Sequence, residues 1–155
     1  MDDISLMRIA LEEAKKAARL KEVPVGAVVV VRNGAVVGKG FNLRETEKNA
    51  LRHAELIAID EACKSLGGWR LCGCTLYVTL EPCPMCAGAI VNSRIERVVY
   101  GAGDPKAGAL GSVFNLLDHP LNHIPQVTGG ILEEECAGIL REFFAQLRNS
   151  RASQG

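Results

Sequence analysis

The sequence has little of three features that would by themselves indicate a function. Its 155 residues include one Trp, two Tyr and four Phe, too few for a broad surface of stacked aromatic rings. Lys plus Arg and Asp plus Glu number 18 each, so any RNA must be bound by local groups rather than by net charge. The longest apolar run near the N-terminus, 25–31, is far shorter than the about 20 residues that a membrane-spanning helix needs.

The N-terminus also lacks a secretory leader, because Met1-Asp2-Asp3 is acidic and no basic segment precedes a long apolar one. We therefore expect a cytoplasmic protein without membrane contact. In a reducing compartment, metal binding accounts for the six cysteines better than disulfides do. The hydrophobic content of 48% is enough for one buried core, which predicts a single domain over 1–150 and a disordered tail over 151–155.

Hydrophobic periodicity predicts an alternation of helices and strands along the chain. Apolar residues recur at helical spacing in four segments: 4–20, 53–65, 83–91 and 131–147. Runs rich in β-branched residues predict strands over 28–31, 36–37, 75–80, 95–100 and 126–128. Asn33-Gly34 between the first two strands is a strong hairpin signal. A hairpin followed by strands that alternate with helices predicts a layered α/β structure with a mixed sheet.

Four residues in two segments carry the most informative chemistry, and they are His53, Glu55, Cys83 and Cys86. Three protein ligands leave a fourth position on tetrahedral zinc open to water, which is the catalytic pattern, whereas structural sites use four ligands. Both segments lie at expected helix starts, where N–H groups and the helix dipole stabilise the thiolates that bind metal. Taken alone, the pair Cys83 and Cys86 is equally consistent with a redox pair or with half of a structural zinc knuckle.

Helical spacing does not explain how Glu55 would join His53. Residues two apart point in roughly opposite directions on a regular helix, so the sequence pattern alone does not place the carboxylate beside the metal. The other cysteines are expected to be packing residues rather than ligands, and they are Cys63, Cys72, Cys74 and Cys136.

The two segments together form the H-x-E…P-C-x-x-C signature of zinc nucleobase deaminases. Further motifs extend the similarity over most of residues 5–148: E-V-P-V-G-A from 22, F-N-L-R-E-T at 41–46, T-L-Y-V-T-L-E-P-C-P-M-C-A-G-A at 75–89, S-R-I-E-R-V-V-Y-G at 93–101 and D-P-K at 104–106. With these motifs the chain resembles the bacterial tRNA-specific adenosine deaminase family, part of the cytidine and deoxycytidylate deaminase superfamily.

The resemblance implies a three-layer cytidine-deaminase-like fold, with a central mixed five-stranded sheet flanked by helices. It also implies deamination of the wobble adenosine of an arginine tRNA with anticodon ACG to inosine. In that reaction His53, Cys83 and Cys86 would hold one zinc ion per subunit, and activated water would attack C6 of the flipped-out adenine. Glu55 would then move protons from the water to N1 and to the departing ammonia.

The resemblance further implies an anticodon stem-loop as the RNA partner and a homodimer in which both chains bind tRNA. The positions that it assigns to RNA binding are Asn42, Arg44, Asp104, Lys106, Asn122, Phe143, Phe144 and Arg148. Ordinary structural roles stay open for them, such as a turn for Asn42 or core packing for Phe143. Two other functions also stay open: deamination of a free guanine or cytosine base or nucleotide, and a non-catalytic zinc-stabilised RNA-binding module.

Overall fold

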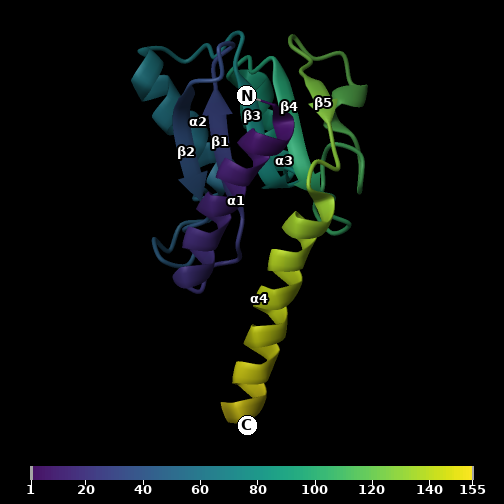
Figure 1. Ribbon diagram of the computed structural model, residues 1–155. Coiled ribbons are helices and arrows are strands. Elements are labelled where there is room, and N and C mark those ends of the chain that lie inside the picture. Colours follow the sequence, from purple (N-terminus) through teal and green to yellow (C-terminus); the bar gives the residue numbers. More distant parts are fainter. Residues whose placement is uncertain (1, 155) are drawn as a thin grey trace.

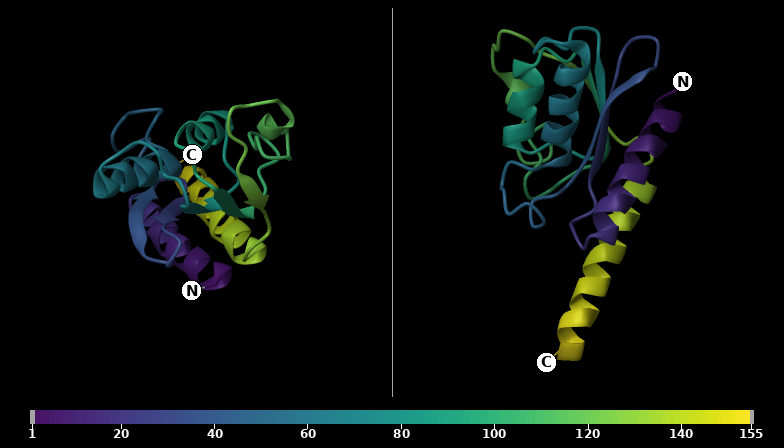
Figure 2. Two further views of the ribbon diagram at one scale, coloured as in Figure 1. Left: turned by 90° about the horizontal axis from the view of Figure 1, so that it is seen from above. Right: turned by 90° about the vertical axis from the view of Figure 1, so that its left-hand side faces the viewer.

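The computed structural model describes residues 2–154 and consists of three layers, with a sheet between two pairs of helices (Figure 2). The helices are α1 (Asp3–Arg19), α2 (Ala54–Leu66), α3 (Pro84–Asn92), the 3-10 helix η1 (Leu116–Asp118) and α4 (Glu133–Gln154). The strands are β1 (Gly26–Val30), β2 (Val36–Phe41), β3 (Thr75–Leu80), β4 (Arg97–Ala102) and β5 (Gln126–Thr128). Helices α1 and α4 cover one face of the sheet, and α2 and α3 cover the other (Figures 1 and 2).

The sheet has the strand order β2-β1-β3-β4-β5. β1 pairs antiparallel with both β2 and β3, whereas β3, β4 and β5 run parallel. The β1–β2 hairpin turns at Asn33-Gly34, where Gly34 has a φ of 88° that favours glycine. This mixed five-stranded sheet between helices confirms the predicted fold class. It also brings the carboxyl ends of β3 and β4 to one end of the sheet, the lower end in Figure 1.

Two hydrophobic clusters fill the spaces on the two faces of the sheet. One joins α2 and α3 to the sheet through residues such as Ala58 and Ile90, and the other joins α1 and the start of α4 through residues such as Met7 and Cys136. The α1 layer lies close to β1, because a Cβ on Gly26 would overlap the carbonyl oxygen of Ala10. Small residues at this contact therefore fix the distance between helix and sheet.

Most predicted elements occur near their predicted positions. The strands 75–80 and 126–128 have the predicted bounds. β4 begins at Arg97 rather than at Ile95, because the Ile95 carbonyl accepts a hydrogen bond from Nε2 of His123 instead of joining the ladder. The predicted helix 131–147 begins at Glu133.

The last helix also continues beyond its predicted end at Leu147. α4 runs to Gln154, so residues 151–154 are helical where the sequence predicted a disordered tail, and Gly155 lies outside the described residues. No glycine or proline follows Gly138 within the helix to stop it. Only the first part of α4 packs on the sheet, and the remainder projects past the lower end of the molecule (Figure 1).

Cys72 corrects one expectation about the cysteines. Cys74 and Cys136 are buried and Cys63 is partly buried, as packing residues should be. Cys72 is exposed, because it lies in the turn before β3 rather than on a core-facing side of an element. Among residues 2–154, no helix combines the length and the apolar character needed to cross a bilayer.

Candidate active site

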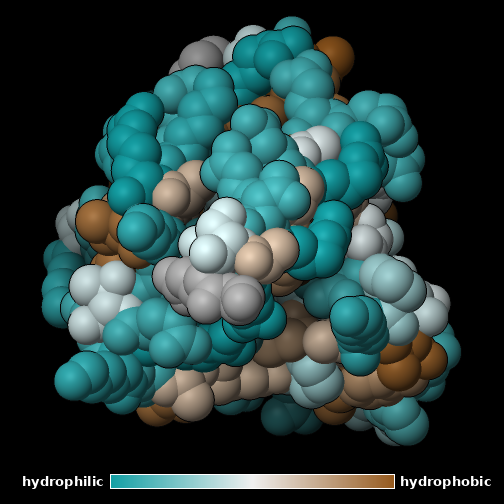
Figure 3. All heavy atoms as spheres, turned by 90° about the horizontal axis from the view of Figure 1, so that it is seen from below, coloured by the Kyte–Doolittle hydropathy of each residue, from teal (hydrophilic) through white to brown (hydrophobic). Residues whose placement is uncertain are grey.

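A cavity of about 210 Å³ opens at the lower end of the sheet, where β3 ends and α2 and α3 begin. Its lining combines apolar and ionisable side chains: Val23, Val25, Asn42, Arg44, His53, Ala54, Glu55, Leu80, Glu81, Cys83, Asp104 and Ala107. Figure 3 looks at this end of the molecule along α4, and most of the face that it shows is hydrophilic. The cavity and the projecting part of α4 therefore lie toward the same end of the molecule, and most of that end is hydrophilic.

His53 and Cys83 occupy equivalent places at the starts of two helices. Each is the N-cap, with extended backbone angles, His53 for α2 and Cys83 for α3. Pro84 fits the first position of α3 because its missing N–H would have no partner there. Cys86 lies one turn into α3 and is fully buried. The two caps and one helical turn thus bring an imidazole and two sulfurs to one point, as the sequence predicted.

The distances among these three side chains fit a tetrahedral metal ion. Nδ1 of His53 lies 3.6 Å from Sγ of Cys83 and 3.5 Å from Sγ of Cys86. In a tetrahedron with zinc bonds of about 2.05 Å to nitrogen and 2.3 Å to sulfur, the N to S edge is roughly 3.5 Å. The three ligand atoms all lie within 4.8 Å of one another. They are therefore a candidate metal centre with room for a fourth, non-protein ligand.

The surroundings favour one thiolate and one thiol in the cysteine pair. The facing Cys86 thiol, together with His53, lowers the pKa of Cys83 to about 4. The Cys83 sulfur, together with burial, raises the pKa of Cys86 above its usual value. The hydrogen bond to Cys83 likewise raises the pKa of His53. The pair thus holds a negative charge in a partly buried place, which suits a divalent cation.

Glu55 reaches the same cavity as His53 although the two residues are only two apart. His53 is the cap and has extended angles (φ −78°, ψ 151°), so the helical rotation that would separate their side chains does not apply to it. Glu55 is only 4% exposed. Burial is the main reason that the pKa of Glu55 rises to about 7, where a carboxyl group can both accept and release a proton.

Three of the predicted RNA-binding residues line this cavity, and they are Asn42, Arg44 and Asp104. The Asn42 side chain donates to the Val23 carbonyl and accepts from the backbone N–H of Arg44, so it also has the turn role that the sequence left open. The fourth residue, Lys106, is exposed in the loop beside the cavity, where its backbone N–H donates to the Asp104 carboxylate. The structure therefore gathers these four predicted residues at one opening.

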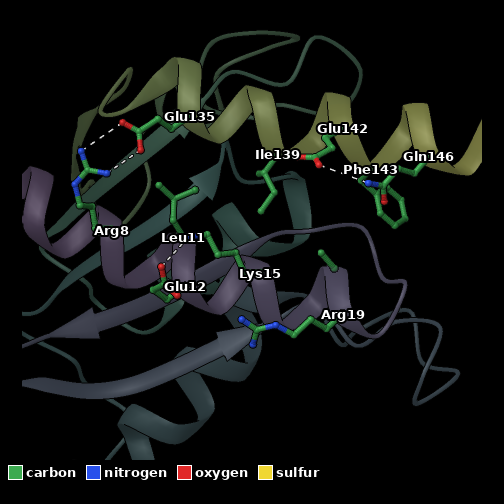
Figure 4. A pocket seen from close by; sticks show the side chains of 11 residues that line it. Arg8, Leu11, Glu12, Lys15, Arg19, Glu135, Ile139, Glu142, Phe143 and Gln146 are labelled. Atoms are coloured by element: carbon green, nitrogen blue, oxygen red, sulfur yellow. Dashed lines mark hydrogen bonds and ion pairs between the residues drawn. The ribbon is translucent and has the colours of Figure 1, made fainter.

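The other predicted RNA-binding residues lie outside the cavity. Phe143 lines a separate groove of about 680 Å³ between α1 and α4, beside Leu11 and Ile139 (Figure 4). Phe144 is 41% exposed and packs edge-on against Phe143, and Arg148 is exposed on the projecting part of α4. No contact among the described residues tests their roles in RNA binding, which stay predictions. Their helix, α4, extends past the same end of the molecule that carries the cavity.

Asn122 lies at the opposite end of the sheet. Its neighbour His123 bonds to Ile95, just before β4 begins, whereas the cavity lies near Ala102, where β4 ends. These two ends of β4 are roughly 20 Å apart. Asn122 thus does not join this cavity.

Two buried glutamates near the cavity were not expected from the sequence. Glu22 accepts hydrogen bonds from the backbone N–H groups of Glu45 and Thr46, and Glu81 lines the cavity and bonds to the loop after β4. Burial raises the pKa of each carboxyl group, but these hydrogen bonds outweigh it, so both pKa values lie below their usual range. Their hydrogen-bond partners are more than twenty residues away in the sequence, so no local pattern identified these two glutamates.

Comparisons with known proteins agree with this site. Residues 1–148 match the family described as MafB19-like deaminase. A tRNA-specific adenosine deaminase of Bacillus subtilis (strain 168) is 57% identical over 146 residues, which cover 94% of this chain and 90% of the relative.

Two solved structures extend the comparison. A structure from studies of A-to-I editing by tRNA:A34 deaminases at the wobble position has a TM-score of 0.84 at 45% identity, covering 88% of this chain and 99% of that one. The guanine deaminase from Nitrosomonas europaea has a TM-score of 0.78 at 26% identity, covering 92% and 84%. The chain therefore belongs to the family of tRNA-specific adenosine deaminases.

Proposed function

We propose that this protein hydrolyses the wobble adenosine of an arginine tRNA with anticodon ACG to inosine, with one zinc ion per subunit. The observation that carries the proposal is the cavity lined by Glu55, His53 and Cys83, with the Cys86 sulfur grouped with His53 and Cys83. Relatives named as tRNA-specific adenosine deaminases match over nearly the whole chain, which supports tRNA rather than a free base as the substrate. A tRNA substrate is also consistent with a cytoplasmic location.

His53, Cys83 and Cys86 would hold the metal. When bound, zinc would supply a Lewis acid that makes a water molecule nucleophilic near neutral pH. Glu55 would take a proton from the water that attacks C6 and deliver it to N1, and would then pass the proton of the new C6 hydroxyl group to the amino group, which leaves as ammonia. Its pKa of about 7 suits both directions of transfer. Adenosine and water thus give inosine and ammonia, with Glu55 unchanged at the end.

The size of the cavity supports a single base as the group that enters it. Its volume of about 210 Å³ is below the about 300–1,000 Å³ that is usual for drug-sized ligands. Unpaired bases of an RNA loop can be splayed out without opening a duplex, so an anticodon loop suits such a site. Asn42 would contact the target nucleoside, and Arg44, Asp104 and Lys106 the anticodon loop around it.

The remaining predicted contacts support a homodimer. Phe143, Phe144 and Arg148 lie in α4, and the later part of this helix extends past the cavity end of the molecule (Figure 1), so that α4 would flank the RNA. Asn122 lies at the far end of the sheet, so it would reach the RNA only from the second copy. Light scattering at micromolar concentration should give the mass of a dimer, and a monomer would contradict this arrangement.

The deciding experiment uses the purified chain with a synthetic stem-loop that carries the ACG anticodon. We expect inosine at the wobble position, about one zinc per chain in the same sample, and loss of activity after chelation that added zinc restores. Free guanine, free cytidine and a stem-loop with another base at the wobble position serve as matched substrates. Turnover of guanine or cytidine with an inert ACG stem-loop would instead establish a deaminase of free bases or nucleosides.

A further inference from the structure

Glu81 is a buried carboxylate that the proposed reaction does not use. It follows β3 and comes two residues before Cys83, with only 2% of its surface exposed. Both of its oxygens lie against one segment, residues 103–112, which we call the 103–112 loop. A carboxylate removed from water needs several donors to stay charged, so the partners of Glu81 indicate what it holds in place.

All four hydrogen bonds that Glu81 accepts come from the 103–112 loop. The backbone N–H groups of Asp104, Leu110 and Ser112 donate at 3.0, 3.0 and 3.1 Å, and the Ser112 hydroxyl donates as well. The donors span nine positions of the chain, so one side chain closes the whole loop around itself. The loop has little regular structure of its own, because only an isolated bridge between Leu110 and Asn115 pairs it.

Gly108 shows how tightly the loop surrounds the carboxylate. A Cβ at this position would overlap Cδ and Oε2 of Glu81 and would lie 2.6 Å from the carbonyl oxygen of Asp104. Only glycine lets the backbone approach the carboxylate this closely. The glycine at position 108 is therefore explained by the approach of the backbone to Glu81.

The 103–112 loop is also one wall of the cavity. Asp104 and Ala107 line the cavity together with Glu81 itself, opposite His53 and Glu55. The loop is tied to the metal-ligand segment a second time, because the backbone N–H of Ala109 donates to the carbonyl of Pro82. The position of Asp104 relative to Cys83 thus depends on the contacts of two adjacent residues, Glu81 and Pro82.

We propose that Glu81 is a positioning residue that holds the 103–112 loop against the cavity and so sets how well the substrate binds. The inference rests on the proposed function, since it concerns substrate binding at the same site. Glu81 fixes the cavity wall that carries Asp104 and Lys106. Glu81 and Pro82 both bond to this wall, and they directly precede Cys83 in the chain. Its loss loosens the wall and weakens binding of the anticodon loop, while the three metal ligands stay where their helices place them.

A purely structural role predicts a different result. If Glu81 only stabilised the fold, its replacement would lower the melting temperature and the amount of active enzyme, and KM would stay constant. A positioning role raises KM for the stem-loop far below the melting temperature, with zinc content unchanged. The ratio of the effects on KM and kcat therefore separates the two roles.

The test compares Glu81→Gln and Gly108→Ala with the wild-type chain, using the ACG stem-loop at a temperature well below unfolding. An amide can accept at only one of its two ends, so Glu81→Gln loses about half of the hydrogen bonds, and Gly108→Ala displaces the loop from the other side. Both variants should bind about one zinc per chain and show a KM raised roughly tenfold or more, as expected for lost hydrogen bonds to a charged group. Amide hydrogen exchange should accelerate at Asp104, Leu110 and Ser112 and stay slow in β3.

Two further variants complete the test. Gly88→Ala adds the same methyl group on α3, where a Cβ meets no atom within 4 Å, and should leave KM unchanged. Ser112→Ala removes one donor and should raise KM by a few fold, which keeps the inference testable if the stronger variants do not fold. Unchanged KM in the loop variants, or loss of zinc from them, would overturn the positioning role. Wild-type protein that leaves the stem-loop unchanged would instead refute the proposed function.

Discussion

Glu55 and Glu81 both line the cavity at the lower end of the sheet, and both are buried, with 4% and 2% of their surfaces exposed. Their surroundings nevertheless shift the pKa values of the two carboxyl groups in opposite directions. Burial raises the pKa of Glu55 to about 7. Burial also acts on Glu81, but donors from Ser112 and the loop backbone outweigh it and lower the pKa. The number of N–H and O–H donors, rather than burial, therefore separates a carboxyl group that can exchange protons from one that stays ionised.

The difference follows from where each glutamate lies in the chain. Glu55 is in the first turn of α2, where the neighbouring backbone is helical and the walls of the cavity are side chains. Glu81 follows a strand end and faces an irregular loop whose N–H groups are free to turn toward it. A helix start thus provides a carboxyl group for chemistry, and a strand end provides one for holding a loop.

The largest effect should come from Glu55→Gln, which keeps the shape of the side chain and removes its ability to move protons. We expect kcat on the ACG stem-loop to fall by about 10² to 10⁴-fold, the usual contribution of general acid–base catalysis. Zinc content should stay near one per chain, since Glu55 is not among the three ligands. Glu81→Gln is the matched variant, because it makes the same chemical change and should act mainly on KM. A normal kcat for Glu55→Gln would show that Glu55 does not transfer the protons.

The sequence predicted that His53, Cys83 and Cys86 lie together, because their positions depend on local signals. His53 and Cys83 are caps, and caps are set by the few residues that follow them, including Pro84. The prediction of strand 75–80 also depended on local signals, because a run with β-branched residues is bounded by turn residues there. The sequence did not show how Glu55 reaches the site, because the answer depends on the extended angles of His53.

Long-range contacts account for what the sequence left out. Glu81 bonds to residues 23 to 31 positions away, and Glu22 to residues 23 and 24 positions away, so no local pattern identifies either as a loop anchor. The place of Asn122 also depends on the fold, because the resemblance grouped it with Asn42 and Arg44 and the structure places it at the other end of β4. Roles that depend on packing across the sheet need the structure.

An intermediate effect is expected for the melting temperature, which Glu81→Gln should lower and Glu55→Gln should not. Glu81→Gln leaves buried N–H donors of the 103–112 loop unpaired, which should lower the free energy of unfolding by about 3 kcal/mol and the melting temperature by roughly 6–12 °C. Glu55→Gln replaces a buried carboxyl group that is about half ionised at pH 7, because its pKa is about 7, with an amide that is always neutral, so it should not lower the melting temperature. Calorimetry of both variants at pH 7 measures the difference. Equal losses would show that burial alone, and not the donors, decides the cost.

The smallest effect should come from Glu22→Gln and should depend on pH. Burial raises the pKa of Glu22, but the hydrogen bonds from Thr46 and Glu45 outweigh it, so the pKa in the folded protein lies below the ordinary 4.5. A lowered pKa contributes stability above pH 4.5 that is lost as pH falls through the folded-state value. The variant should therefore melt roughly 2–4 °C lower at pH 7, from about 1 kcal/mol.

The melting temperatures of the wild type and of Glu22→Gln, plotted against pH, should converge as the pH drops below 4.5. The wild-type carboxylate then becomes protonated and no longer accepts its hydrogen bonds more strongly than the amide does. Glu61→Gln, an exposed change on α2 that removes the same charge, controls for net charge and should keep a constant offset. A Glu22→Gln curve that stays parallel to the wild type from pH 7 to pH 3 would contradict the role of the Thr46 and Glu45 donors. Convergence would show that Glu22, like Glu81, is a carboxylate whose hydrogen bonds hold a loop. The loop held by Glu22 is the one that carries Asn42 and Arg44.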